Sequence, residues 1–197
     1  MPQTLLSLLG LSLVTLLSVN QQRVTTQGYQ NRLHDEYDLA ASGVMMHVME
    51  LIASRSFDEQ STPEKINISR DIPDHPSDFT HRNDFGTTAA CDLERPALTP
   101  DCDDVDDLDG IEGQRVYARL RGDKTLPFDV SIDVYYVGDD NLEVPASHRT
   151  KNKRVVLTAE SPLRPGVELV RLERVVSYDP VKAEADYESE YGFLAEI

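Results

Sequence analysis

Residues 5–19 of this chain read LLSLLGLSLVTLLSV, and this stretch decides the fold. It belongs to a longer uncharged segment, because the first charged side chain is that of Arg23. A helix satisfies its backbone hydrogen bonds internally and can sit in lipid, and from Met1 to Gln22 it would extend about 33 Å. The sequence therefore predicts an apolar helix that needs a membrane, a bundle of identical helices, or both in turn. We assign its membrane or bundle-core positions to Leu5, Leu6, Leu8, Leu9, Leu11, Leu13, Val14, Leu16, Leu17 and Val19.

The helical pattern continues beyond this apolar segment. Apolar residues recur at spacings of three, four and seven, which is typical of a helix with one buried face. No proline occurs between Pro2 and Pro63. We predict one helix over residues 1–57, about 80 Å long, in which residues 1–22 form the membrane or bundle part and residues 23–57 pack on a head domain. The apolar positions of the second part are Val24, Leu33, Tyr37, Ala40, Ala41, Val44, Met45, Val48, Leu51 and Ile52.

A cleavable secretory signal is an alternative interpretation of the same N-terminal segment. Such a signal has a positively charged start and a cleavage site of the small-x-small type. Residues 1–4 include no Lys or Arg, and Ser18-Val19-Asn20 does not match that cleavage site. One long helix explains both the apolar segment and the apolar spacing that continues after it, whereas a signal peptide explains only the apolar segment.

Charge and cysteine content narrow the class of protein. The chain has 197 residues and a formal net charge of −16, with 35 acidic against 19 basic side chains. Phosphate binding depends on Lys and Arg, so this balance argues against a nucleic-acid partner. The only two cysteines, Cys91 and Cys102, are close together, and in an exported protein we expect them to form a disulfide. Two unpaired thiols are the alternative.

The remainder of the chain changes character twice. Residues 58–112 are rich in Asp, Pro, Ser, Thr and Asn, and we predict an irregular acidic connecting region that contains the disulfide. Apolar and polar residues then alternate, which indicates an antiparallel sheet over residues 113–180 with one apolar face for the helix to cover. Residues 181–197 form an acidic tail, either an edge element or a docking segment. The expected strands are Val116–Leu120, Phe128–Tyr136, Arg154–Thr158 and Val167–Tyr178.

The acidic residues near the second cysteine are candidate ligands for a hard cation. Six aspartates and Glu112 fall within twelve residues without a basic side chain, and Ca²⁺ prefers such oxygen ligands. Counting back from Gly110 puts Val105 at the first ligand position of an EF-hand, so the segment is not an EF-hand loop. A solvated acidic loop is the alternative to a Ca²⁺ site. The candidate ligands are Asp103, Asp104, Asp106, Asp107 and Asp109.

A long N-terminal helix, first apolar and then amphipathic, on a four-stranded antiparallel sheet resembles the type IV pilin superfamily, which includes pilins, minor pilins and the pseudopilins of type II secretion. The stretch from Ala40 to Ile52 resembles the part where such helices enter the head domain. Residues 103–110, 128–132 and 153–155 resemble the heads of minor pilins of the mannose-sensitive haemagglutinin type. The resemblance implies an α+β fold and a filament of identical subunits.

The same resemblance implies how such a subunit assembles. The helix would hold it in the cytoplasmic membrane before assembly and would lie in the core of an extracellular filament afterwards. Leu5 stands where mature pilins usually carry Glu. Assembly would therefore depend on apolar packing between helices.

Motifs of enzymes are missing from the sequence. We find no Gly-rich phosphate loop, no His-Glu-x-x-His, no nucleophile elbow and no Cys-x-x-Cys. We therefore expect a structural protein and not an enzyme: a subunit of a type IV pilus-like filament at the cell surface. Two alternatives are a membrane-anchored exported domain of an adhesin or of a type II secretion apparatus, and a secreted hydrolase or sugar-binding domain behind a signal peptide.

Overall fold

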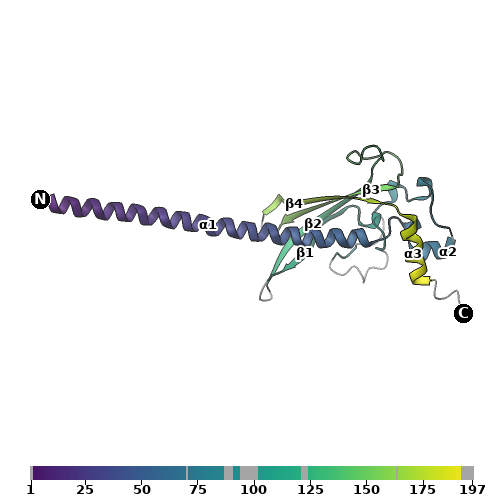
Figure 1. Ribbon diagram of the computed structural model, residues 1–197, viewed down its shortest axis with the longest axis horizontal. Coiled ribbons are helices and arrows are strands. Elements are labelled where there is room, and N and C mark those ends of the chain that lie inside the picture. The colour runs from purple at the N-terminus through teal and green to yellow at the C-terminus, as the bar shows by residue number, and fades with distance from the viewer. Residues whose placement is uncertain are drawn as a thin grey trace. The chain divides into compact units, whose positions relative to one another are not determined.

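The computed structural model describes residues 2–69, 71–86, 91–93, 102–120, 124–162 and 164–191, and the side chains of residues 2–9, 33, 164 and 165 lie outside this description. The fold is α+β, with the predicted long N-terminal helix and four-stranded antiparallel sheet (Figure 1). The helices and strands are α1 (Pro2–Ser54), α2 (Pro63–Ser69), β1 (Ile111–Arg119), β2 (Thr125–Tyr136), β3 (Asn152–Ser161), β4 (Arg164–Ser177) and α3 (Pro180–Tyr191).

Helix α1 runs for 53 residues and ends earlier than predicted, at Ser54 instead of Phe57. The N–H of Arg55 donates to the carbonyl of Ile52 at 3.0 Å, a tighter turn than that of an α-helix. The next residue, Ser56, forms a parallel β-bridge with Asp104. The helix ends here because the backbone groups of Ser56 pair with Asp103 and Val105 in the acidic segment, residues 102–112.

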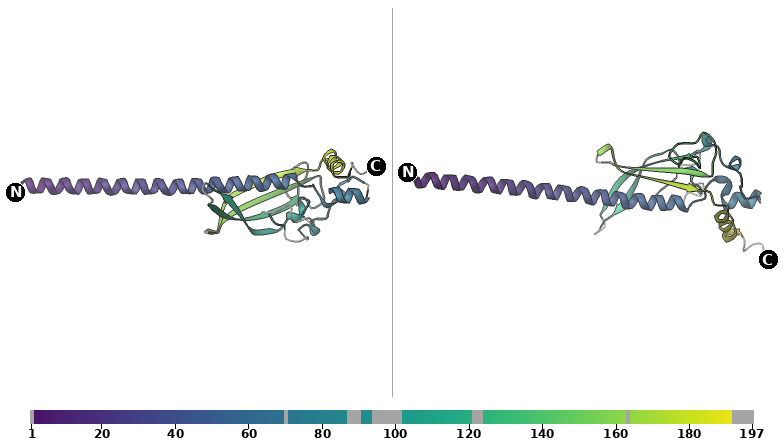
Figure 2. Two further views of the ribbon diagram at one scale, coloured as in Figure 1. Left: turned by 90° about the horizontal axis from the view of Figure 1, so that it is seen from below. Right: turned by 45° about the horizontal axis from the view of Figure 1, so that its top comes forward.

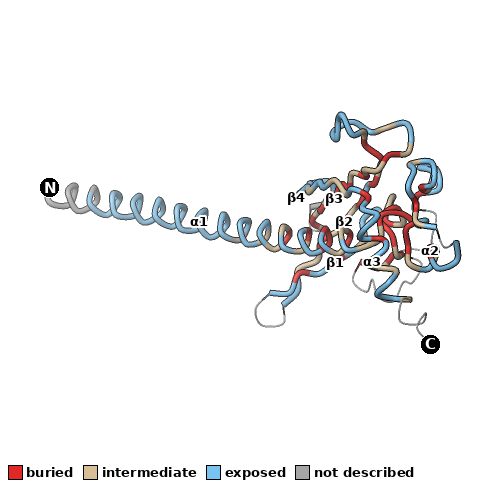
Figure 3. Tube along the Cα trace, turned by 45° about the vertical axis from the view of Figure 1, so that its right-hand side comes forward, coloured by how far each residue is buried: buried red, intermediate tan, exposed pale blue. Residues whose placement is uncertain are grey.

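The chain divides into two compact units, Met1–Ala40 and Ala41–Ile197. The buried face of α1 begins with Ala41, later than the predicted start near Val24, which is 63% exposed. Residues 25–36 are almost all polar and interrupt the apolar stripe. Figure 3 shows the change from exposed to buried turns along the tube of α1.

The sheet is an antiparallel meander in the order β1-β2-β3-β4. All four strands lie where the sequence predicts strands, but β1 starts at Ile111 instead of Val116, and β3 extends beyond the predicted Arg154–Thr158 at both ends. Buried residues alternate along β2 from Phe128 to Tyr136, as the period-two pattern predicts. Ile132 pairs with Leu157 of β3, so both side chains lie on the same face.

The core of the second unit lies between that face and the C-terminal part of α1, which runs alongside the strands in both views of Figure 2. Apolar residues at helical spacing line the buried side of α1. Because Met45, Val48, Met49 and Ile52 belong to the same buried cluster as the sheet residues, the helix covers the apolar face. The buried apolar residues of α1 are Ala41, Met45, Val48, Met49 and Ile52.

Two helices lie outside the predicted elements. The region 58–112 was predicted to be irregular, and it contains α2 and several single 3-10 turns. The tail, for which we predicted an edge element or a docking segment, begins with α3. Just before α3, the side chain of Asp179 accepts a hydrogen bond from the N–H of Val181 at 3.0 Å, and Pro180 occupies the first helical position.

Candidate assembly helix and buried charged cluster

The first candidate functional feature is the apolar start of α1. Leu5, Leu6, Leu8 and Leu9 have side chains outside the described part of the chain. The other predicted positions are at least half exposed: Leu11 68%, Leu13 57%, Val14 65%, Leu16 72%, Leu17 61% and Val19 50%.

These exposed apolar side chains surround the helix. Successive residues of an α-helix are about 100° apart, so Leu11, Leu13, Val14 and Leu16 already point in four different directions. A helix that is apolar on all sides is buried in a larger assembly or in lipid, whereas a one-sided stripe would fit a single partner. Among the described residues, no helix is both long enough and apolar enough to cross a membrane.

The second feature is the disulfide, which confirms the predicted pairing. Cys91 and Cys102 are joined, with their Cα atoms 5.7 Å apart. Both residues are buried. The bond ties the connecting region to the start of the acidic segment.

Most of the predicted Ca²⁺ ligands in the acidic segment hydrogen-bond to other protein groups. One oxygen of Asp104 accepts the N–H groups of Asp106 and Asp107 at 2.8 and 3.0 Å. Asp109 accepts the N–H of Val134 at 2.6 Å, which fastens the segment to β2. These carboxylates shape the backbone, in the way that aspartates do in turns. The five predicted ligands therefore do not converge on one point.

A different group of carboxylates does converge. Glu59, Asp103 and Asp104 each place an oxygen within 4.8 Å of the others, close enough for one cation to contact all three. The second oxygen of Asp104 is buried and accepts no hydrogen bond from the described residues. The Ca²⁺ site stays a prediction, and Glu59 is a member that sequence reasoning missed.

Burial and mutual repulsion make Asp103 and Asp104 easier to protonate than ordinary carboxylates. Burial, together with the negative charges of Glu59 and Asp107, raises the pKa of Asp103 to about 6. Burial and the nearby Asp106 raise the pKa of Asp104 well above its ordinary value. A bound proton or a cation would relieve the same repulsion.

A buried lysine forms the third feature. The Nζ of Lys153 on β3 donates to the carbonyl of Phe57 at 2.7 Å and to Asp58 at 2.8 Å. It also contacts a carboxylate oxygen of Asp106. The side chains of Lys153 and Asp58 are fully buried, and that of Asp106 is almost so. All three hydrogens of the ammonium group can thus be accepted without water.

Asp58 holds this charged cluster in place. Its carboxylate accepts the N–H and the hydroxyl of Thr80, each at 3.0 Å, and the hydroxyl of Tyr136 at 3.2 Å. The same Tyr136 hydroxyl lies 2.8 Å from the carbonyl oxygen of Thr80. Burial and the charge of Asp58 raise the pKa of Tyr136, which therefore stays a neutral donor.

Sequence reasoning missed Lys153, although the strand pattern contains the signal. Lys153 lies two residues before Val155 and four before Leu157, and it pairs with Tyr136 across the sheet. Because alternate residues of a strand share one face, this spacing places a lysine on the apolar face, where it needs a buried acidic partner.

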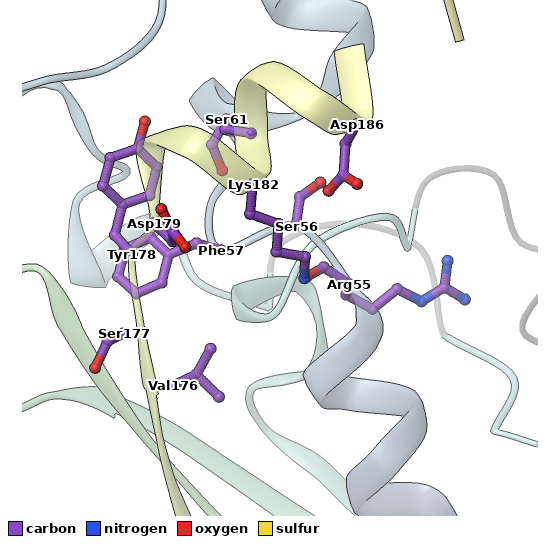
Figure 4. A pocket seen from close by; sticks show the side chains of 11 residues that line it. Arg55, Ser56, Phe57, Ser61, Val176, Ser177, Tyr178, Asp179, Lys182 and Asp186 are labelled. Atoms are coloured by element: carbon purple, nitrogen blue, oxygen red, sulfur yellow. The ribbon is translucent and has the colours of Figure 1, made fainter. Parts of the chain in front are cut away.

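A small pocket lies where the end of α1 meets β4 and α3 (Figure 4). Lys182 of α3 reaches across it, and its Nζ lies 3.4 Å from the carbonyl oxygen of Arg55. Phe57 and Tyr178, with ring centroids 5.6 Å apart, form its apolar side. This contact fastens the C-terminal helix to the head.

Comparison with family models, with curated proteins and with solved structures found no match to this chain.

Proposed function

We propose that this protein is a structural subunit of an extracellular, type IV pilus-like filament, assembled through the apolar start of α1. The single observation that carries the proposal is the apolar surface that surrounds α1 between Leu11 and Val19. Identical helices packed in a bundle would cover that surface on every side. A contact of this kind, repeated without closing into a ring, produces an open filament.

The fold of the second unit supports the same proposal. A four-stranded antiparallel sheet covered by the second part of α1 is compatible with a pilin-like head. The strongly acidic composition favours a solvent-facing role for the head, because like charges keep neighbouring surfaces soluble. Before assembly, the same apolar helix would hold each subunit in the cytoplasmic membrane.

A charge placed in the apolar segment tests the proposal. Leu11→Asp or Val14→Asp would bury a carboxylate among leucines without a partner, which is costly in an apolar bundle. We expect cells that produce either variant to lose filaments from sheared surface material, as seen by negative-stain microscopy. The matched control is Leu142→Asp, the same change at a 41% exposed position of the head.

The outcome is decisive only if the subunit is still made. Immunoblots of whole cells should show each variant at the level of the unaltered protein. Abundant filaments from Leu11→Asp or Val14→Asp cells would refute the proposal. Loss of filaments from Leu142→Asp cells as well would show that the microscopy does not report on the helix.

A further inference from the structure

The buried position of Lys153 has a chemical consequence beyond assembly. Its Nζ contacts two carboxylates, Asp58 at 2.8 Å and Asp106, in a site where both partners are almost completely buried. Lysine is among the residues least often fully buried. An amine in lasting contact with a carboxyl group, shielded from water, has the geometry needed for condensation.

Aromatic rings complete the enclosure of this amine. The Nζ of Lys153 lies 4.4 Å from the ring centroid of Phe57, 5.0 Å from that of Phe85 and 5.3 Å from that of Tyr136. These rings exclude water from the amine and the carboxyl groups. Exclusion of water opposes hydrolysis of an amide formed there and lowers the effective dielectric constant.

The two carboxylates are held differently. Asp58 accepts hydrogen bonds from Gln60, Thr80 and Tyr136, so its oxygens are fixed by several donors. Asp106 lies in a 3-10 turn on the acidic segment, and its side chain contacts Lys153 and the neighbouring Asp104. Asp106 can lose an oxygen with the loss of fewer donated hydrogen bonds than Asp58, so it is the better acyl acceptor. Asp58 contacts the same Nζ and is the group placed to take its protons.

We propose that Lys153 and Asp106 become joined by an isopeptide bond, an amide between the two side chains, with Asp58 as the proton-carrying carboxylate. The Nζ attacks Cγ of Asp106, so a C–N bond forms and one C–O bond of the carboxyl group breaks. Of the three ammonium hydrogens, one stays on the amide nitrogen and two leave with the released oxygen as water. Asp58 takes and returns protons and ends in its starting state, so no oxidant, reductant or other reactant is needed.

Removal of buried charge favours this product. The ion pair costs desolvation energy for both ions, whereas a neutral amide has no such cost. The bond would join β3 to the acidic segment across 47 residues of sequence. Together with the disulfide Cys91–Cys102, it would fasten that segment at its start and near its middle. This inference does not depend on filament assembly.

The test is the mass of the unaltered full-length protein after denaturation and reduction. We expect it to fall short of the sequence mass by one water molecule, once the N-terminal peptide has been mapped. Protease digestion should release one branched peptide that contains both Lys153 and Asp106. A succinimide at Asp109-Gly110 would also lose water, but it joins no two peptides.

Variants identify the groups involved. Lys153→Met and Asp106→Ala should restore the full sequence mass, and Asp58→Asn should leave the two partners unlinked. The matched control is Lys151→Met, which changes a partly exposed lysine two positions away and should keep the loss of water.

Two results would overturn the proposal without any variant having to fold. One is the full sequence mass for the folded, unaltered protein. The other is a branched peptide that contains Lys153 and Asp58 instead of Asp106. A loss of water that persists in Lys153→Met would overturn it equally.

Discussion

At the scale of single residues, Gly86 shows how closely the acidic segment packs on the connecting region. Its φ angle is +61°, and a Cβ atom at this position would lie 2.2 Å from the carbonyl oxygen of Asp109. Its N–H donates to the carbonyl of Asp106 at 3.0 Å. Only glycine combines this left-handed backbone with so close an approach.

Replacement of Gly86 by alanine should therefore be costly. Gly110 offers a matched control, because its φ is +77° and its missing Cβ would meet no atom within 4 Å. The left-handed backbone costs about 1–2 kcal/mol for either alanine variant, and overlap with Asp109 should add about 1–3 kcal/mol at position 86 alone. Urea unfolding of the full-length protein in mild detergent would measure the difference. Equal midpoints for Gly86→Ala and Gly110→Ala would contradict close packing of Gly86 against Asp109.

Individual residues also show why part of the site escaped prediction. The pairing of Cys91 with Cys102 was predictable because the chain has only these two cysteines. The cluster around Lys153 was not, because Asp58 and Asp106 are distant in sequence and only the fold brings them together. The sequence does not show which aspartate in a turn lies close to a lysine on a distant strand.

At the scale of elements, the sequence predicted the helices and strands that have a long periodic pattern of apolar residues, and it did not predict the short helices. The alternation from Phe128 to Tyr136 predicted β2 because one face of the strand is buried. Helix α3 is short and mostly exposed, so apolar spacing gave no signal. Its start was nevertheless readable, since Asp179-Pro180 is a typical helix N-terminus.

The carboxylates of Glu59, Asp103 and Asp104 come from different parts of the chain, and they predict a linked response to calcium and pH. Because the pKa of Asp103 is about 6 in the folded protein against an ordinary value of 3.8, the folded state binds this proton more tightly than the unfolded state. The stability that the proton contributes is complete below the ordinary value and is lost as the pH rises through about 6. We expect the melting temperature in chelator to be higher at pH 5 than at pH 7.

Calcium should replace the proton at the higher pH. A ligand at about a hundred times its dissociation constant adds about 2.7 kcal/mol of stability, so millimolar Ca²⁺ should raise the melting temperature at about pH 7 and much less at about pH 5. Asp103→Asn should abolish the calcium response and weaken the pH response, because the raised pKa values of Asp104 and Asp106 remain. Asp140→Asn, at an exposed position, should keep both responses. Identical melting curves with calcium and with chelator at the higher pH would leave the group without a metal role.

At the scale of the whole molecule, the apolar surface is divided between the two units. The described members of the buried core all belong to the unit Ala41–Ile197. The exposed leucines of the unit Met1–Ala40 add nothing to that core, so folding of the head does not account for them. The filament proposal assigns them to an environment outside the single chain.

This division predicts that the head folds without the start of α1. A variant that begins at Gln30 keeps every described core residue, so we expect it to unfold cooperatively, at nearly the melting temperature of the full-length protein, and to be monomeric without detergent. A variant that begins at His47 lacks Ala41 and Met45, both fully buried. Loss of one large buried side chain costs about 2–5 kcal/mol, a large part of the 5–15 kcal/mol that is typical of a domain. The shorter variant should therefore lose its cooperative transition in circular dichroism. If instead the Gln30 variant melts far below the full-length protein, the first 29 residues stabilise the head, and their apolar surface is not reserved for other subunits.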